Sequence, residues 1–297
     1  MPTRVSTNQI YTGGLEHISQ ARGHELSSAE KAQTNKEVNR PSDAPATWVR
    51  ASNLKDGLST GDNIQRNVVI ANHFMTAADT ALTQLQEFIQ RTQELAISAA
   101  DGNARRDMIL KDAQGLWSSV LQTMNSRYGD RGLFGGFQTK APAFDAEGNF
   151  LGDNNAIRIE IAAGSEPVPI NFSASQIFLG MGLKEGVDIP MIYKNFIQGL
   201  QENNVELIQS CLPQLIQANE QISLGRGEVA GRMSQVSRAL DSYASERTST
   251  ADSVSQLEDA DAYKVFSELA RDQTIFQSAL MTNKKVLTEA PADILFK

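Results

Sequence analysis

The sequence predicts a mainly α-helical fold, with long antiparallel coiled-coil rods built from both chain ends and a small β-rich central insert. Two observations predict the rods: residues 46–141 and 214–290 contain no proline, and the first stretch carries an unbroken heptad repeat. Proline kinks or ends a helix, so its absence shows where long helices can form. The insert is predicted because residues 140–190 hold six glycines and four prolines.

The heptad repeat predicts the first rod helix, over residues 44–100. Its apolar positions follow one another at alternating spacings of four and three, which is the a/d pattern of a coiled coil. They are Ile64, Val68, Ala71, Met75, Ala78, Leu82, Leu85, Ile89, Thr92, Ala96 and Ala99. At about 1.5 Å per residue such a helix would be roughly 85 Å long.

A proline-rich segment, Arg40-Pro-Ser-Asp-Ala-Pro45, precedes this helix and indicates where it starts. Pro41 favours an extended chain, and Ser42 or Asp43 is expected to cap the first turn. Pro45 falls within that turn, where a missing backbone N–H costs nothing.

Further helices are expected over 104–128 and after Pro190, followed by a second and weaker heptad run. Its seam includes Met233, Val236, Leu240, Val254 and Leu257, and we expect the helix that carries it to pack against Leu82, Leu85 and Ile89 of the first rod. Ser255-Gln-Leu-Glu258 fits a capping box, which predicts a joint near residues 258–261 and a new helix over 262–288.

The central insert is expected to be built from short strands. Residues 156–162 alternate between apolar and polar side chains, as a half-buried strand does. Residues 168–172 predict another strand, at an edge because of Pro169. Residues 144–150 predict the tip of a hairpin.

Both ends of the chain carry a sparse apolar stripe on a predicted helix. The N-terminal helix, over 8–35, presents Leu15, Ile18 and Leu26, and the C-terminal helix presents Phe266, Leu269, Phe276 and Leu280. Neither stripe can be buried by its own helix, so we expect the two ends to pair and to gain further cover on assembly.

Three domains are therefore expected. Residues 1–40 and 258–297 would form a terminal coiled-coil domain, and residues 41–139 and 191–257 a helical rod domain. Residues 140–190 would form the outer β-rich insert.

Composition and residue spacing argue against several function classes. The net charge of −8 is unsuited to nucleic-acid binding, and no apolar run is long enough to insert into a membrane. Cys211 is the one cysteine, which precludes an internal disulfide, and the three histidines lack neighbours at metal-ligand spacing. We find no catalytic, cofactor-binding or metal-ligating set, and expect no cofactor and no enzymatic activity.

Several segments at the two ends resemble the flagellin superfamily. They are Arg91–Asn103 and Leu257-Glu-Asp-Ala-Asp-Ala-Tyr263, and Arg40–Pro45 and Leu133–Phe144 are most similar to the hook-associated protein 3 branch. The positions that carry the resemblance are Arg40, Pro41, Ser42, Asp43, Pro45, Glu94, Leu95, Phe134, Gly136, Thr139, Phe144, Glu258, Asp259 and Asp261. Residues 146–224 show no such resemblance.

The resemblance implies a structural adaptor at the junction between the hook and the filament of the bacterial flagellum. Its implied partners are further copies of itself in a ring, the first hook-associated protein, flagellin, and the flagellar export apparatus with its chaperone. It also implies an extracellular location reached through the flagellar type III channel without a Sec signal peptide. The alternatives are a filament flagellin, a peptidase hidden in the insert and a chaperone-like coiled-coil binding module.

Overall fold

The computed structural model describes residues 7–101 and 104–295 and is mainly α-helical, which confirms the predicted fold class. The helices are α1 (Thr7–Thr34), α2 (Pro45–Ala99), α3 (Arg106–Met124), α4 (Ala174–Leu179), α5 (Ile189–Gln201), α6 (Val205–Glu258) and α7 (Ala262–Leu295). The strands are β1 (Arg127–Tyr128), β2 (Arg131–Gly132), β3 (Arg158–Ile159) and β4 (Val168–Pro169).

Packing divides the chain into two compact units. The terminal unit comprises Met1–Ser59 and Glu246–Lys297, and the central unit comprises Thr60–Ser245. The boundaries fall inside α2 and α6, so each unit contains part of both helices. The sequence placed the domain boundaries at 40/41 and 257/258 instead, and that division into inner, rod and outer domains stays a prediction.

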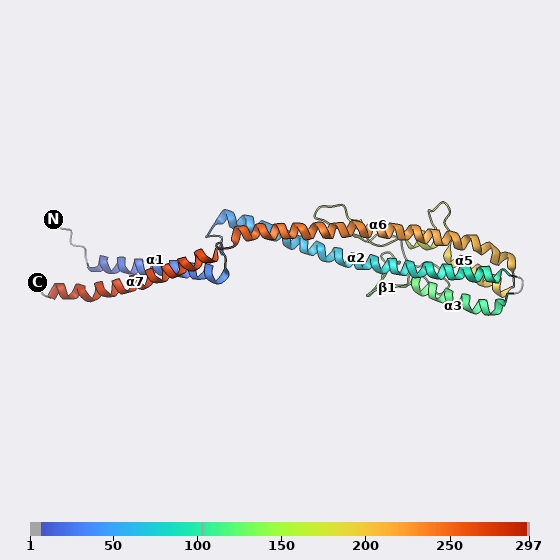
Figure 1. Ribbon diagram of the computed structural model, residues 1–297, viewed down its shortest axis with the longest axis horizontal. Coiled ribbons are helices and arrows are strands. Elements are labelled where there is room, and N and C mark those ends of the chain that lie inside the picture. The colour runs from blue at the N-terminus through green and yellow to red at the C-terminus, as the bar shows by residue number, and fades with distance from the viewer. Residues whose placement is uncertain (1–6, 102–103, 296–297) are drawn as a thin grey trace. The chain divides into compact units, whose positions relative to one another are not determined.

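In the terminal unit, α1 and α7 lie side by side (Figure 1). The unit also holds the first turns of α2 and the last turns of α6. The loop after α1 and the connection between α6 and α7 meet in a short antiparallel bridge, Lys36 to Asp259. This bridge ties together segments that are more than two hundred residues apart in the sequence.

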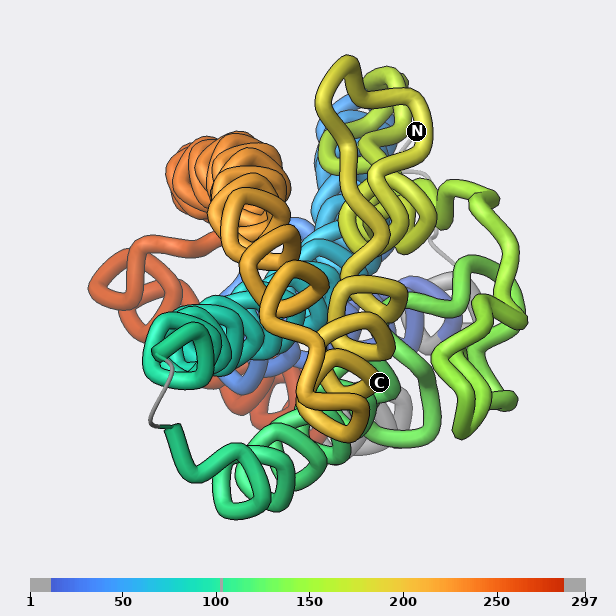
Figure 2. Tube along the Cα trace, turned by 90° about the vertical axis from the view of Figure 1, so that its right-hand side faces the viewer, coloured from blue at the N-terminus to red at the C-terminus, as the bar shows by residue number. Residues whose placement is uncertain are grey.

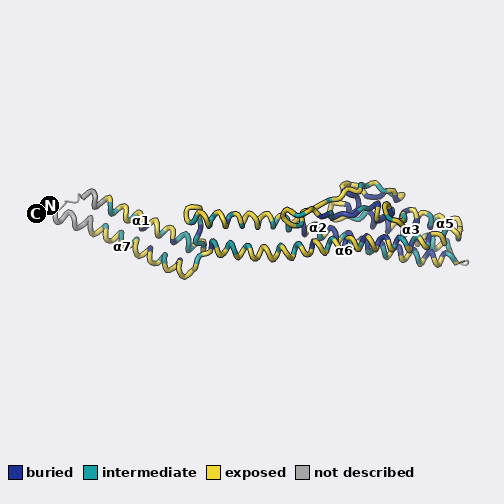
Figure 3. The backbone as a smooth tube through the Cα atoms, turned by 90° about the horizontal axis from the view of Figure 1, so that it is seen from above, coloured by how far each residue is buried: buried dark blue, intermediate teal, exposed yellow. Residues whose placement is uncertain are grey.

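In the central unit, a single apolar core joins α2, α6 and the segments between them. The α2 side of this core includes Val68, Met75, Leu82, Leu85 and Ile89, all buried, and the α6 side includes Val229 and Val236. The ion pair between Arg226 and Asp79, at 2.9 Å, and a hydrogen bond from Gln86 to Ser223 connect the two helices. Figure 3 shows buried residues concentrated where the middle of the chain covers these helices.

The middle of the chain contains less strand than the sequence predicted. The stretch 156–162 contributes only β3, which pairs antiparallel with β4, and β4 includes Pro169. The bridge between Phe144 and Phe150 closes the predicted hairpin tip. Most of the segment is irregular and is held by side chains, and it lies to one side of the α2–α6 pair (Figure 2).

Helix α6 begins earlier than expected and continues through Pro213. The sequence placed the long helices in stretches without proline, and α6 extends beyond its stretch, 214–290, on the N-terminal side. Pro213 cannot donate to the carbonyl of Gln209, but both residues are exposed, so water can reach the freed carbonyl oxygen.

Candidate assembly surface on the terminal helices

Small residues on α1 form the line of contact with α7. Gly14, Ala21 and Ser28 follow one another at intervals of seven, and Ala21 and Ser28 are buried. A Cβ atom added at Gly14 would lie 2.6 Å from Oδ1 of Asn283. Ser28 Oγ donates a 2.5 Å hydrogen bond to Oδ2 of Asp272, which is buried as well. Small side chains therefore let the two helices approach closely.

Four large apolar residues of these two helices are left largely exposed. Leu15 is 46% exposed, Leu26 60%, Phe266 60% and Leu280 43%. The other three predicted stripe residues, Ile18, Leu269 and Phe276, are half-buried. The expectation that pairing would cover the stripes is wrong for the four exposed residues, because the seam is made by smaller side chains. The terminal unit thus presents an apolar surface to solvent.

A cleft of about 610 Å³ lies between α1 and the loop before α2. Gly23, Leu26, Ser27, Ala29, Glu30, Lys31, Gln33, Asn39, Arg40 and Asp43 line it. The guanidinium group of Arg40 forms an ion pair with Glu30 at 2.6 Å, which holds the loop against α1. Leu26 lines this cleft and is also one of the four exposed stripe residues of the terminal helices.

Asp43 organises the loop and does not cap α2 as the sequence predicted. Its Oδ2 accepts hydrogen bonds from the backbone N–H groups of Arg40, at 2.8 Å, and Asn39, at 2.9 Å. These bonds lower the pKa of the Asp43 carboxyl. The carboxylate folds the chain back on itself just before the proline that starts the helix.

The last residue of α6, Glu258, is the centre of the junction between the terminal helices and the rest of the unit. Its side chain is only 3% exposed, and it accepts a hydrogen bond from Lys36 at 2.9 Å and one from Lys55 at 2.5 Å. Backbone hydrogen bonds reinforce the junction: Glu37 N to Glu258 O at 2.7 Å, and Ala260 N to Asn35 O at 3.0 Å. One buried carboxylate thus connects the loop after α1, helix α2 and the end of α6.

The two lysines determine the charge state of Glu258. Burial alone would raise the pKa of its carboxyl, but the hydrogen bonds from Lys55 and Lys36 outweigh burial and hold the pKa below its ordinary value. The hydrogen bond between Lys36 and Glu258 also raises the pKa of Lys36. Glu258 is therefore a charged acceptor in a largely desolvated place.

The predicted capping box at Ser255–Glu258 does not start a helix. Ser255 lies inside α6, and its hydroxyl donates to Asp259. The residue that caps α7 is Asp261, whose Oδ1 accepts hydrogen bonds from the backbone of Tyr263 at 2.9 Å and Lys264 at 3.3 Å. Of the three carboxylates at this joint, Glu258, Asp259 and Asp261, it is Asp261 that caps helix α7.

Comparisons with known proteins show which family the chain resembles. Residues 5–139 match the family model described as the bacterial flagellin N-terminal helical region. Flagellar hook-associated protein 3 of Salmonella typhimurium and that of Escherichia coli are each 26% identical to the chain over 180 residues. Over these residues the chain is similar to proteins of the flagellin superfamily.

The match to these two superfamily members covers 59% of this chain and 56% of each relative, so the chain spans about half the length of the curated relatives. Solved structures show the same fold. A putative flagellar hook-associated protein from Vibrio parahaemolyticus covers 73% of this chain with a TM-score of 0.67 and 15% identity, and all of that protein is matched. FlgL of Bacillus cereus covers 68% with a TM-score of 0.60 and 14% identity, over 99% of its own length.

The residues that suggested the superfamily lie in both units. Arg40, Pro41, Ser42, Asp43 and Pro45 are exposed in the loop before α2 and its first turn, and Asp259 and Asp261 are exposed beside buried Glu258. In the central unit, Leu95, Phe134, Gly136 and Phe144 are buried, Thr139 is half-buried, and exposed Glu94 pairs with Arg91 at 2.6 Å. Phe134 and Phe144 both pack edge-on against Phe178.

The predicted rod seam also extends through both units. Val68, Met75, Leu82, Leu85, Ile89 and Val236 are buried, whereas Ile64, Met233, Leu240, Val254 and Leu257 are half-buried. All the buried positions lie in the central unit, whereas Val254 and Leu257 lie in the terminal unit. The seam is therefore best covered in the central unit.

Sequence reasoning missed the small-residue seam on α1 and the two lysines that bind Glu258. The heptad spacing of Gly14, Ala21 and Ser28 could have indicated this seam. It was missed because only large apolar residues were considered as seam positions on this helix. No local sequence pattern identifies Lys36 or Lys55 as partners of Glu258. Glu258 lies 222 residues from Lys36 and 203 residues from Lys55 in the sequence.

Two classes of site are not seen in the part of the chain that the structure describes. Among the side chains that the structure describes, no three of His, Cys, Asp or Glu are placed to hold a metal ion. Within the same residues, no helix combines the length and apolar character needed to cross a membrane.

Proposed function

We propose that this protein is a structural adaptor of the bacterial flagellum that joins the hook to the flagellin filament. The observation that carries the proposal is the similarity over 180 residues to two proteins named flagellar hook-associated protein 3. The adaptor acts by binding, without catalysing a reaction. Its partners are further copies of the chain, the first hook-associated protein and flagellin.

The terminal unit supplies the assembly surface in this proposal. Leu15, Leu26, Phe266 and Leu280 remain exposed after α1 and α7 have paired, so their burial must come from other subunits. Burying large apolar side chains drives subunit association. The paired ends, residues 1–40 and 258–297, would line the inner tube, and residues 41–139 and 191–257 would provide rod contacts between neighbours.

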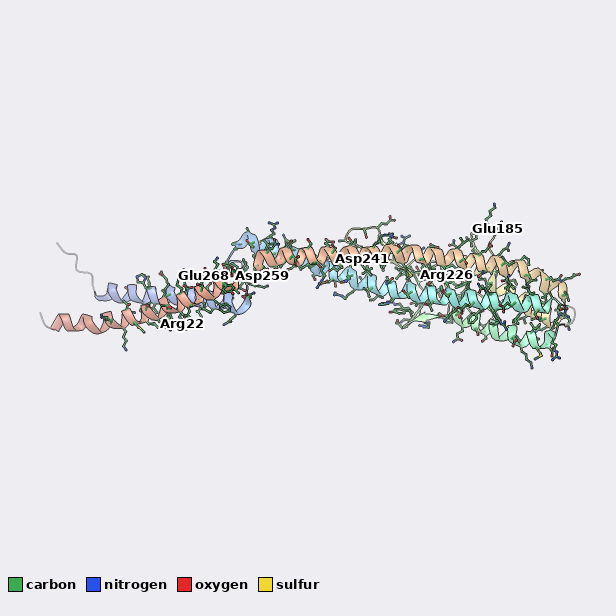
Figure 4. The ribbon with its side chains drawn as sticks, in the orientation of Figure 1. Arg22, Glu185, Arg226, Asp241, Asp259 and Glu268 are labelled. Atoms are coloured by element: carbon green, nitrogen blue, oxygen red, sulfur yellow. The ribbon has the colours of Figure 1, made fainter. Side chains whose placement is uncertain are left out.

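The outer insert, residues 140–190, would face solvent. Its acidic residues Glu147, Glu160, Glu166 and Glu185 are exposed, and Figure 4 shows Glu185 extending away from α6. A hydrated acidic surface is suited to the outside of an assembly. The protein would reach this place through the flagellar export apparatus, delivered by an export chaperone.

Deletion of the gene in the source bacterium tests the adaptor role. The expected phenotype is intact hooks, no filaments, and unpolymerised flagellin in the medium. Restoration by the wild-type chain controls for effects on neighbouring genes. Filaments of normal length in the deletion strain would contradict the proposal, and polymerisation of the purified chain alone into micrometre-long filaments would favour a filament flagellin.

A further inference from the structure

One surface of the central unit combines exposed aromatic rings with positive charge. It consists of Arg127, Tyr128, Arg131, Phe137 and Lys140 and is called the hairpin surface here. Strands β1 and β2 pair antiparallel, Gly132 N donates to Thr139 O at 2.7 Å, and Arg127 Nη1 donates to Lys140 O at 3.1 Å. These bonds hold residues 127–132 and 137–140 together.

The hairpin surface has the character of a binding surface. Phe137 is 60% exposed and Tyr128 39%. Three cations stand against one carboxylate, Asp130, in a chain whose net charge is −8. Aromatic residues and arginine are enriched in the cores of protein interfaces.

A groove of about 230 Å³ lies elsewhere on the same unit, between α6 and the loop after α4. Leu183, Lys184, Glu185, Gln217, Glu220, Gln221 and Leu224 line this acidic groove. Leu224 is 69% exposed. Buried Gln221 fixes the loop, because its Nε2 donates to Ile177 O at 2.8 Å and Val187 O at 3.0 Å, and its Oε1 accepts from Val187 N at 2.9 Å.

The hairpin surface and the acidic groove complement each other in charge. Within the described residues, no ion pair engages Arg131 or Lys140 on the hairpin surface, or Glu185 or Glu220 in the groove. Lys184 is the one cation among the groove's lining residues. Each surface also offers an exposed apolar side chain, Phe137 on one and Leu224 in the other.

The two surfaces lie at different places on the central unit. In the view shared by Figures 1 and 4, β1 lies below α2, whereas Glu185 lies above α6. One copy of the chain therefore cannot bring its own two surfaces together. Different patches that face in different directions are the requirement for head-to-tail contacts, which close into rings when the rotation between subunits allows it.

We propose that the hairpin surface of one copy docks on the acidic groove of a second copy, with Phe137 against Leu224 and Arg131 and Lys140 facing Glu185 and Glu220. The inference rests on the proposed function, because a ring of copies supplies the second molecule. It adds which two faces meet between neighbouring subunits.

Cysteine crosslinking in assembled flagella tests this contact. The chromosomal gene of the source bacterium is replaced by the variant Phe137→Cys with Leu224→Cys, flagella are sheared off and oxidised, and the chain is followed on non-reducing gels. Each copy can then bond to two neighbours, so we expect a ladder that extends beyond the dimer. Either single variant should remain monomeric, since native Cys211 is buried.

The variant Phe137→Cys with Ile97→Cys is the matched control, because Ile97 is 60% exposed in the same unit but lies outside the groove. Motile cells whose flagella give no ladder, or an equal ladder from the control, would overturn the docking contact and leave the adaptor role intact. Filaments in the deletion strain would instead overturn the adaptor role.

If the cysteine variants do not assemble, substitutions that reverse the charges of the two surfaces test the docking contact. Arg131→Glu with Lys140→Glu, and separately Glu185→Arg with Glu220→Arg, should each reduce the number of filaments per cell several-fold. All four substitutions in one chain should restore most of that number. A fourfold variant no better than the weaker pair would rule the contact out.

Discussion

The carboxylate of Glu258 lies 2.9 Å from the ammonium nitrogen of Lys36 and is also hydrogen-bonded to Lys55. The carboxylate is nearly inaccessible to water, whereas the two lysine side chains are 40% and 44% exposed. Buried charges are tolerated when they are paired and hydrogen-bonded, as this one is. The junction of the terminal unit therefore depends on Glu258, because replacing this side chain would leave the ammonium groups of Lys36 and Lys55 without their acceptor.

Glu258→Gln should destabilise the terminal unit, because the amide removes the charge that both lysines bind. A hydrogen bond to a charged group contributes about 1–3 kcal/mol. Because solvent screens the two partly exposed lysines, we expect the free energy of unfolding to fall by an amount within that range, although two bonds are affected. Urea unfolding followed by circular dichroism measures it. Glu246→Gln, at an exposed position of α6, is the control and should change stability by less than about 0.5 kcal/mol. Equal effects would show that Glu258 has no special role.

The contribution of this ion pair should depend on pH at both extremes. The pKa of Glu258 is lowered from its ordinary 4.5, so its contribution is complete above that value and is lost as the pH falls through the lowered pKa. The pKa of Lys36 is raised from 10.5, so its contribution is complete below that value and is lost as the pH rises through the raised pKa. The stability difference between wild type and Glu258→Gln should be constant near neutral pH and shrink at both ends. A difference that stays unchanged as the pH falls towards acid unfolding would argue against the ion pair.

Gly136→Ala should strongly destabilise the central unit. Gly136 has a φ of +66°, and an added Cβ would lie 2.2 Å from the backbone oxygen of Asp153, so both backbone strain and overlap oppose a side chain. We expect a loss of at least about 2 kcal/mol in thermal or urea unfolding. Gly115→Ala is the matched control: this glycine lies within α3 with open space around it, and alanine there should stabilise by about 0.5–1 kcal/mol.

Leu26→Ser and Phe266→Ser should leave the monomer's stability nearly unchanged, because both side chains are already largely exposed. Swimming motility should nevertheless fall sharply if these side chains are buried between subunits. Spreading in soft agar measures swimming motility. Measuring the secreted amount of each variant in parallel distinguishes a defect in assembly from a defect in export. Normal spreading by the double variant would show that the apolar surface is not used.

The sequence predicted the long helices well because their signal is repeated many times. From Val68 to Ile89 each heptad adds an independent indication, and tertiary packing agrees with the local pattern. Single-residue signals were less reliable. Asp43 and Ser255 both fit capping patterns, but Asp43 turns back to the preceding loop and Ser255 lies within α6.

Contacts between residues far apart in the sequence could not be predicted from one chain. The burial of Glu258 depends on Lys36 and Lys55, and the seam of α1 becomes visible only when α7 is laid against Gly14. The middle segment lacks strong periodicity because buried polar side chains such as Gln221 and Asn171 shape it through hydrogen bonds to the backbone.

The paired loops at residues 35–37 and 258–260 have a mechanical consequence. Two covalent connections leave the α1–α7 pair, and backbone hydrogen bonds join them side by side. A torque on the helix pair is shared between two tethers loaded in parallel, and neither can swivel about its own single bonds while the other stays fixed. Such a linkage transmits rotation where a single flexible tether would dissipate it.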